Sequence, residues 1–484
     1  MSLHADQSML ARDVVLAKDA AEPLYQQLYT QLRSAIVGGG QWAAGTRLPS
    51  SRELATEFGV SRNTVVLAYQ RLQEDGFVRG MAGGGTVVGD LPVVAPARDS
   101  GAWRDAAVEQ APYGLPNSAF PVGVPPVDLF PTTLWAGLTS RRLRTSGVRV
   151  LLGPGLFGYR PLREAIAGYL WVVRGIRCTP EQVIVTRGLD AGLDLLGRAL
   201  LSEGDRVWCE EPGHQPVLAR HGVRRHPVPV DEDGLDVDAA IAVAPDAALA
   251  LVSAACQLPM SVAMTESRRA RLLDHAHRRS MWVVEHENDT AFLGRQAARP
   301  LIADDERGRV IHVGTFDTVL FPQLHVGYCV VPDGLIDTVG RAVADADTQA
   351  SGLTQAVLAD FLNHHRFARF LARITSACAS RRELLRDALL RLPGTPLTVV
   401  GDAGRGSYLT TVFRRPATES GLVADAARLS LNLAPLSRYF STADPTTGLL
   451  LGCAAAREET IGPAVRLLAS LLRRHVRPVP DNAE

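Results

Sequence analysis

Lysine is nearly absent from this sequence. Lysine and arginine together number 51, and the only lysine is Lys18. A GC-rich genome is the simplest cause of such a bias. Whatever the cause, chemistry that needs a lysine amine has one candidate, near the N-terminus, and a lysine Schiff base is not expected in the long C-terminal part of the chain.

The sequence also lacks a surplus of either charge. Its 51 basic and 51 acidic residues give a formal net charge of zero. Nothing therefore draws the whole chain toward nucleic acid, and contact with DNA must come from a local basic face. The cysteines show no CxxC spacing, so we expect free thiols in a reducing compartment. They are Cys178, Cys209, Cys256, Cys329, Cys378 and Cys453.

Long apolar runs and targeting signals are missing as well. No signal peptide opens the chain, and no apolar run reaches the roughly 18 residues that a membrane span needs. We expect a cytoplasmic protein without a membrane partner. With 484 residues, 46% of them hydrophobic and 21% charged, the chain is expected to form two or three globular domains.

Residues 1–89 have the pattern of a small helical domain with a hairpin. Apolar residues recur at helical spacing over 24–36, and three glycines follow. A short second helix is expected to start at Ser50 or Ser51, and a third to run over 61–76. Two short apolar segments around a glycine-rich turn come next and are typical of a β-hairpin. The order predicts a winged helix-turn-helix; a generic small helical domain is the alternative.

The rest of the chain predicts an α/β fold. Residues 90–112 are rich in proline, alanine and polar residues, and we interpret them as a linker. Residues 113–478 alternate helical patterns with short β-rich runs, which indicates a mainly parallel sheet covered by helices. The last part of this domain has the pattern of a smaller α+β subdomain.

The N-terminal domain resembles the GntR family of bacterial regulators. The matching segments, in order, are "PLYQQLYTQLRSAI", "GTRLPSSRELA", "FGVSRNTV" and "GFVRG" followed by "GGGT". They span the whole domain. The resemblance implies binding to a double-stranded DNA operator.

The start of the third helix is the expected DNA-reading element. Arg62, Asn63 and Thr64 lie on its first turn, where a recognition helix meets base edges; arginine can pair with guanine and asparagine with adenine. Arginines before this helix suit phosphate contacts, and the wing suits the minor groove or the backbone. Any one arginine could equally be a solvated surface charge. The full candidate set is Arg47, Ser50, Arg52, Ser61, Arg62, Asn63, Thr64, Gly84 and Thr86.

The large domain resembles the fold-type I aminotransferase domain found in the MocR subgroup of GntR regulators. The matching segments include "GVPPVDLFPTTLWAGL", "GPGLFGYRPLREAIAGYLWVVRGIRCTPEQVIVTRG" and "GTFDTVLFPQLHVGY". Members of the subgroup are dimeric and typically hold pyridoxal phosphate (PLP). The resemblance therefore implies a homodimer and an operator with two half-sites.

The residue that would carry PLP is missing. In relatives, the segment "GTF" is followed by Ser-Lys, and that lysine forms the Schiff base with the cofactor. This chain has Asp317 and Thr318 at these two positions. A threonine hydroxyl cannot form an imine, so we expect no covalently bound PLP and no resident cofactor.

Other positions depart from the subgroup's pattern at the same predicted pocket. His286 and Asn288 stand where relatives have the aspartate and tyrosine of "EDDYD", and His325 replaces the arginine for the cofactor phosphate. Leu189 replaces a serine of the phosphate loop, and the segment "CQLPMS" keeps a glutamine but introduces a cysteine. The expected effector-binding residues are Leu189, His214, Cys256, Gln257, His286, Asn288, Asp317, Thr318 and His325.

Several interpretations of this pocket remain open. His214, Cys256, His286 and His325 could be metal ligands, although their spacing matches no known metal pattern. They could also fill a pocket that binds nothing. We favour a pocket that takes a ligand less anionic than a phosphate ester.

Three hypotheses for the function remain. The favoured one is a DNA-binding regulator whose aminotransferase-like domain senses an effector and dimerises. The second is a constitutive regulator with a purely structural large domain. The third, a residual PLP-dependent aminotransferase, is opposed by the single lysine.

Overall fold

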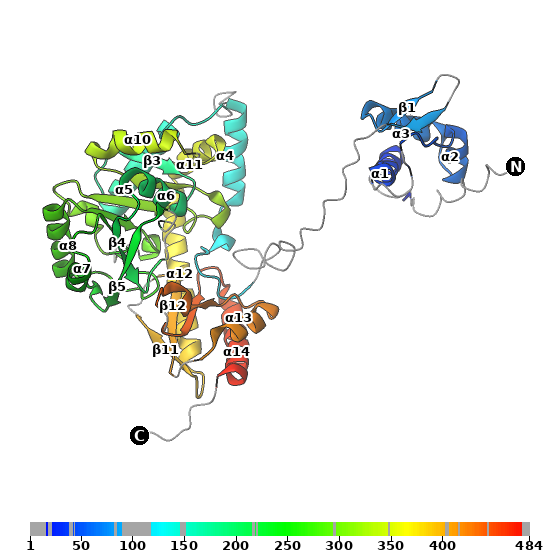
Figure 1. Ribbon diagram of the computed structural model, residues 1–484. Helices are drawn as coiled ribbons and strands as arrows, with labels where there is room; N and C mark the ends of the chain where they lie inside the picture. The colour runs from blue at the N-terminus through cyan, green and yellow to red at the C-terminus, as the bar shows by residue number, and fades with distance from the viewer. Residues whose placement is uncertain are drawn as a thin grey trace. The chain divides into compact units, whose positions relative to one another are not determined.

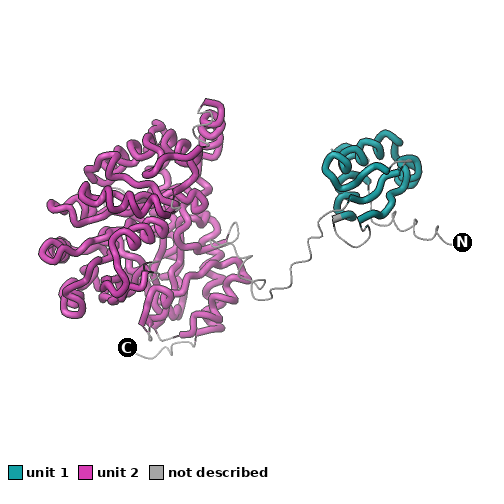
Figure 2. Tube along the Cα trace, turned by 45° about the horizontal axis from the view of Figure 1, so that its top comes forward, with its two compact units in different colours: residues 1–108 teal, residues 109–484 magenta. Residues whose placement is uncertain are grey.

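The computed structural model describes most of the chain outside the predicted linker. The described residues are 16–17, 22–37, 42, 44–81, 85–89, 118–145, 152–214, 218, 221–293, 297–346, 349–401, 406–414, 417–442 and 445–476. The chain divides into two compact units, Met1–Val108 and Glu109–Glu484 (Figure 2). The linker predicted at 90–112 lies outside the described residues, so its bounds stay a prediction.

The N-terminal unit is a winged helix-turn-helix, as predicted. Its elements are α1 (Leu24–Val37), α2 (Ser51–Glu57), α3 (Arg62–Glu74), β1 (Val78–Gly80) and β2 (Thr86–Val88). The two strands pair antiparallel and form the wing. Leu28, Leu54 and Leu72, one from each helix, are fully buried in a common core.

Two serine caps set where the helices of the motif begin. Of the two serines expected at the start of α2, Ser50 is the cap: it accepts a hydrogen bond from the Glu53 backbone N–H, and the Glu53 carboxylate accepts one from the Ser50 N–H. Such a reciprocal box satisfies two N–H groups that the helix leaves unpaired. Ser61 caps α3 by accepting a hydrogen bond from the Thr64 N–H.

The large unit is built on an eight-stranded sheet with the order β3-β10-β9-β8-β7-β4-β5-β6 (Figure 1). Its interior pairs from β5 to β9 are parallel, whereas β10 pairs antiparallel with β3 and β9, and β6 pairs antiparallel with β5. The strands are β3 (Val183–Thr186), β4 (Arg206–Glu211), β5 (Arg224–Asp231), β6 (Gly234–Leu235), β7 (Leu249–Val252), β8 (Trp282–His286), β9 (Val310–Thr315) and β10 (Gly327–Val330).

Helices cover both faces of this sheet. On β3, Val183 and Val185 pack into one hydrophobic cluster and Ile184 into another, because successive side chains point to opposite faces. The α-helices are α4 (Thr132–Thr145), α5 (Arg160–Arg174), α6 (Leu189–Leu200), α7 (Val237–Val243), α8 (Glu266–Arg279), α9 (Thr290–Leu293), α10 (Ile336–Ala344), α11 (Gly352–Leu362) and α12 (Phe367–Leu390). No helix among the described residues is long and apolar enough to cross a membrane.

The C-terminal part is the expected smaller α+β subdomain. A four-stranded antiparallel sheet has the order β11-β12-β14-β13 and packs against α13, α14 and the C-terminal end of α12. Its elements are β11 (Leu397–Val400), β12 (Tyr408–Phe413), α13 (Glu419–Arg428), β13 (Ala434–Pro435), β14 (Gly448–Gly452) and α14 (Glu458–His475). The α/β class predicted from the alternating pattern is therefore confirmed.

Candidate functional site

The first turn of α3 is exposed in the N-terminal unit. Arg62 and Asn63 are solvent-exposed, and Thr64 is half-buried, while Val65 on the opposite face is fully buried. The Ser61 hydroxyl lies 2.8 Å from the Thr64 hydroxyl, and Arg62 Nε donates to Ser51 Oγ at 3.4 Å. The helix thus presents its polar N-terminal turn to solvent, as a recognition helix does.

A second arginine lies against the wing. Arg47 is exposed and forms an isolated β-bridge with Val87 of β2. A β-carbon on Gly85 would lie about 3.0 Å from Arg47 Nη2, so a glycine here lets the guanidinium approach the wing backbone. Arg52 on α2 is exposed as well, and Thr86 begins β2, whereas Gly84 is outside the described residues.

Strand order gathers the candidate effector residues at one edge of the large sheet. Most of them follow a parallel strand: Leu189 after β3, His214 after β4, Gln257 after β7 and Thr318 after β9. The carboxyl ends of parallel strands meet at the same edge, where ligands of open α/β sheets bind. His286, the last residue of β8, and His325, just before the antiparallel β10, belong to that edge too.

A buried hydrogen-bonded chain ends at His286. Ser253 donates its backbone N–H and its hydroxyl to the carboxylate of Glu210, both at 2.9 Å, and Ser253 Oγ lies 2.9 Å from His286 Nε2. When Glu210 is ionised, the hydroxyl proton points to the carboxylate, so Ser253 accepts from Nε2–H and His286 Nδ1 keeps a lone pair. This Nδ1 is buried and has no partner among the described residues.

Burial controls the charges of this chain. It lowers the pKa of His286 to about 3, so the imidazole is neutral at physiological pH. It raises the pKa of the Glu210 carboxyl to about 7, against the hydrogen bonds from Ser253 and Gln257 that favour the ionised form. The edge of the sheet therefore has a neutral imidazole at the position where the resemblance implies the aspartate of PLP-binding relatives.

Two more candidates lie near His286. His214 packs its ring at 5.6 Å from that of His286, and its Nε2 lies 3.3 Å from Asp190 on the first turn of α6. Gln257 donates to the Pro212 carbonyl at 2.7 Å, so it braces the backbone just before His214.

Asn288 and Cys256 approach the small subdomain. The Asn288 side-chain amide donates to the Tyr408 hydroxyl at 3.2 Å, and this hydroxyl donates to the Gln257 carbonyl at 3.4 Å. Cys256 is buried. Burial raises the pKa of Tyr408, and Cys256 adds to this effect. Tyr408 lies on β12, so it joins the two parts of the large unit at this edge.

Asp317 lies at the N-terminus of α6. Its Oδ1 accepts a hydrogen bond from the Val326 N–H at 3.1 Å, and its Oδ2 lies 2.9 Å from where a β-carbon on Gly188 would be. Gly188 caps α6 with a φ of 85°, a conformation that favours glycine. Burial raises the pKa of Asp317, and the nearby His325, an exposed residue, counteracts this effect.

Thr318 borders a cavity of about 10 Å³, room for about one water molecule. Glu287 and Tyr328 line the same cavity. Glu287 pairs with Arg174 at 2.5 Å and accepts a hydrogen bond from the Tyr328 hydroxyl at 3.3 Å. The acid of this ion pair, Glu287, therefore lines the small cavity at the position expected for the Schiff-base lysine.

Sequence reasoning missed the residues that support the edge from below. These residues pair with one another from elements far apart in the sequence. They are the buried Glu210, Ser253, Arg174 and His312 and the half-buried Glu287. The separation along the chain is 43 residues for Ser253 and Glu210, and 113 for Arg174 and Glu287. A buried acid within an apolar strand was the only available signal. Among the described residues, no group of three or more metal-ligating side chains could hold an ion.

Comparison with known proteins places both units. Residues 24–88 match the family model described as bacterial regulatory proteins, gntR family. The chain is 35% identical over 473 residues to a probable rhizopine catabolism regulatory protein MocR of Rhizobium meliloti, with 94% of this chain and 95% of that protein covered. It is 29% identical to the pyridoxine biosynthesis regulator PdxR of Corynebacterium glutamicum, with 94% of this chain and 97% of that protein covered.

Solved aminotransferases share the fold of the large unit. LysN, an α-aminoadipate aminotransferase of Thermus thermophilus, matches with a TM-score of 0.67 and 26% identity over 73% of this chain and 92% of that one. An archaeal alanine:glyoxylate aminotransferase matches with a TM-score of 0.68 and 23% identity over 75% and 92%. From the full-length similarity to MocR, the helix-turn-helix and the aminotransferase fold, the chain belongs to the MocR subgroup of the GntR family of transcriptional regulators.

Proposed function

We propose that this regulator binds its operator as a homodimer in the cytoplasm and senses a small molecule other than PLP in its aminotransferase-like domain. The DNA contacts are assigned to the first turn of α3, to Arg47 and Arg52, and to the wing. The effector is assigned to the sheet edge around His286 and Thr318. Support for each assignment comes from the geometry and charge of the residues concerned.

The first argument against PLP is the absence of an amine. Thr318 follows "GTF" where the resemblance calls for lysine, and the only lysine of the chain is Lys18 in the other unit. Without an internal Schiff base, PLP would have to be held by hydrogen bonds and charge alone.

The carrying observation is the carboxylate of Asp317 at the N-terminus of α6. The free N–H groups and the dipole of a helix N-terminus favour an anion, which is how phosphates are commonly bound. Here a carboxylate of the chain itself lies beside the capping Gly188. A phosphate dianion at the same place would meet a like charge, so the N-terminus of α6 disfavours PLP and other phosphate esters.

His286 adds a second mismatch. Its ring is neutral, and while Glu210 is ionised its Nδ1 keeps a lone pair, so it cannot stabilise a pyridinium as a carboxylate does. The residues present therefore do not fit PLP. They fit a ligand that has an N–H or O–H donor for His286 Nδ1 and carries no phosphate.

Exposed apolar side chains support the homodimer. Trp171 and Val172 at the end of α5 are 50% and 81% exposed, and Leu152 and Leu156 are 81% and 51% exposed. Contiguous exposed apolar patches mark protein–protein contacts, and we assign these side chains to the dimer interface. A dimer would also double the DNA contact through two half-sites.

A constitutive regulator is the second candidate, favoured by the small size of the cavity at Thr318. Glu287, which pairs with Arg174, and Tyr328 line this cavity of about 10 Å³. A domain stabilised in this way could serve only for dimerisation, in which case no metabolite would alter operator affinity.

Pocket-filling variants test the proposal. A metabolite panel screened by thermal shift on the full chain identifies the effector, and its influence on operator affinity is then measured. Cys256→Trp and Thr318→Trp should remove the response to that effector and leave effector-free operator affinity within about twofold. A full response in both variants would place the sensor elsewhere, and a panel without any effect on affinity would favour the constitutive regulator.

A further inference from the structure

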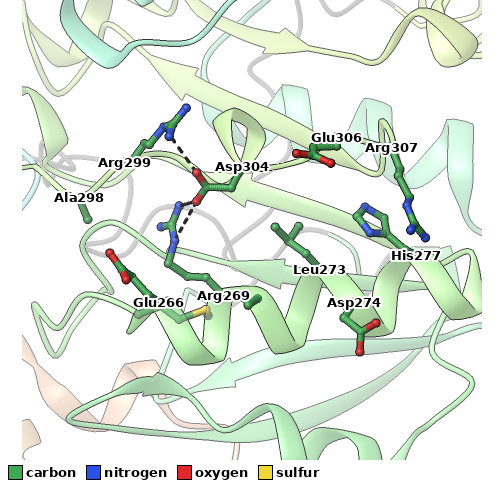
Figure 3. Close-up of a pocket in the computed structure, with 12 residues that line it drawn as sticks. Glu266, Arg269, Leu273, Asp274, His277, Ala298, Arg299, Asp304, Glu306 and Arg307 are labelled. Atoms are coloured by element: carbon green, nitrogen blue, oxygen red, sulfur yellow. Dashed lines mark hydrogen bonds and ion pairs between the residues drawn. The ribbon is translucent and has the colours of Figure 1, made fainter.

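A separate cavity of about 660 Å³ lies between α8 and the segment that leads to β9 (Figure 3). This volume is within the range of small-molecule sites. Its lining comes from α8 on one side and from residues 298–307 on the other. None of the residues assigned above to DNA or to the effector lines it.

One end of the cavity is a rigid cluster of paired charges. Arg269 is buried and donates through both Nε and Nη2 to Asp304 Oδ2, and Arg299 Nε lies 3.5 Å from Asp304 Oδ1. Figure 3 shows both guanidinium groups directed at this single carboxylate. Because Asp304 is shared by two arginines, this end keeps its shape without a ligand.

The other end carries an adjacent acid and base without partners. Glu306 and Arg307 are exposed, and among the described residues their side chains form no hydrogen bond or ion pair. Their backbone is held in place because Asp305 accepts from the Arg307 N–H at 3.1 Å and pairs with His277 at 2.8 Å. Two opposite charges next to each other on a fixed turn match the two charges of a zwitterion.

The floor between the two ends is largely apolar. Leu273 and Ala270 of α8 face the cavity, and Met264 and Ala298 complete its lining. The acids and bases of the lining are nearly balanced, so neither a plain anion nor a plain cation is favoured. Asp274 at the rim is already paired with Arg278.

We propose that this cavity is a second ligand site, which binds a small zwitterion of the α-amino acid type. The ammonium pairs with Glu306, the carboxylate pairs with Arg307, and the rest of the molecule lies over Leu273 and Ala270. An amino acid with an apolar side chain satisfies all three features at once.

The wall of the cavity is tied to the network beneath Thr318. The Leu301 N–H donates to both carboxylate oxygens of Glu285, at 3.0 and 2.9 Å, and Arg174 Nη2 donates to the Ala298 carbonyl at 3.5 Å. Arg174 pairs with Glu287, which lines the small cavity at Thr318. A ligand that shifts this wall acts on the same buried charges that underlie the sheet edge.

Calorimetric titration of the full chain with the standard L-amino acids tests the site. Each amino acid is compared with its N-acetyl and its carboxamide derivative, which remove one charge each. At least one amino acid is expected to bind, and either derivative should bind at least tenfold more weakly. Glu306→Gln and Arg307→Gln should each weaken binding at least tenfold. The control variants Glu181→Gln and Arg160→Gln, which alter an exposed pair 3.5 Å apart elsewhere, should not.

A steric variant separates this site from the sheet edge. Ala270 is exposed on α8, so Ala270→Trp fills the cavity floor without entering the core, and it should abolish binding. Thr318→Trp should leave it intact. The inference is overturned if no amino acid binds, if Ala270→Trp binds normally, or if binding is lost only in Thr318→Trp. That last result would instead support the effector site at the sheet edge.

Discussion

The carboxylate of Asp317 lies against Gly188, with Oδ2 2.9 Å from the position of a β-carbon on that glycine. The two residues are far apart in sequence, and the sheet joins them because β3 and β9 end at the same edge. The anion-favouring start of α6 thus already has a negative group beside it. We expect this contact to weaken phosphate binding at the start of α6.

Removing this carboxylate should create a phosphate site. In Asp317→Ser the start of α6 loses one of its two nearby carboxylates and keeps Asp190, so inorganic phosphate is expected to bind at least tenfold more tightly than to the parent protein, as measured by titration calorimetry. Asp194→Ser, which removes a carboxylate later in the same helix, is the matched control and should change little. Equal phosphate affinity in the Asp317→Ser variant and the parent would show that Asp317 does not exclude phosphate.

Restoring the lysine alone should not restore tight PLP binding. In Thr318→Lys the new amine can form an imine with PLP. Asp317 and His325 still do not supply a partner for its phosphate, and His286 does not supply one for its ring nitrogen. We expect a weakly bound imine that dialysis removes, and its absorbance band measures the loss. A stable, stoichiometric imine in this variant would mean that the other substitutions are unimportant.

The two arginines of the DNA-binding unit should behave differently. If Arg62 contacts a base, Arg62→Ala should cost about 1–3 kcal/mol on the cognate operator and relax specificity at one position. Arg47→Ala should weaken all sequences alike and reduce the salt slope by about one. Competition binding at several salt concentrations distinguishes the two patterns, and identical behaviour of both variants would refute the assignment of a base contact to Arg62.

Assembly is open to direct measurement. We expect a homodimer at micromolar concentration in sedimentation, and a footprint with two repeated half-sites. Trp171→Glu and Val172→Glu should weaken the dimer if the exposed apolar residues of α5 lie in the interface. A monomer with a single-half-site footprint would contradict the proposal.

His312 should make stability depend on pH. Burial opposes its charged form, but the carboxylates of Glu287 and Glu285 outweigh burial and raise the pKa of His312 to about 9. A histidine whose folded pKa is raised stabilises the fold fully below its unfolded pKa of about 6.5, and this contribution is lost as the pH rises through the folded value.

The free energy of unfolding is therefore expected to fall between about pH 6.5 and pH 9, by up to the order of 3 kcal/mol from this group. Denaturant titrations at several pH values measure the fall. In His312→Gln the fall over this window should be much smaller, whatever the overall loss of stability. An unchanged pH profile in that variant would show that His312 is not charged in the folded protein.

The sequence predicted the fold well because its signals are local. The serine at position 50 or 51 and Ser61 indicated where α2 and α3 begin, and the alternation of helices and β-rich runs indicated a mainly parallel sheet. The strand order also brought candidates such as His214 and His286 together. They lie close together because β4 and β8 end at the same edge of the sheet.

The supporting charges could not be predicted in this way. Arg174 and Glu287 pair across 113 residues of sequence, and nothing near either of them identifies the other. The position of Asp317 beside Gly188 likewise depends on β3 and β9 being brought to one edge with β10 between them. The 660 Å³ cavity has no sequence motif, since its lining combines a helix face with a loop.

Equilibrium dialysis of the purified full chain against PLP, followed by borohydride reduction and peptide mass spectrometry, tests the central claim most directly. We expect a colourless protein, no saturable PLP binding at micromolar concentration and no pyridoxyl group on the peptide that contains Thr318. Since Lys18 is the only lysine, an adduct at Lys18 or at the N-terminal amine lies on a different peptide from Thr318 and is easily distinguished. Saturable binding of about one PLP per chain that Thr318→Trp abolishes would contradict the account.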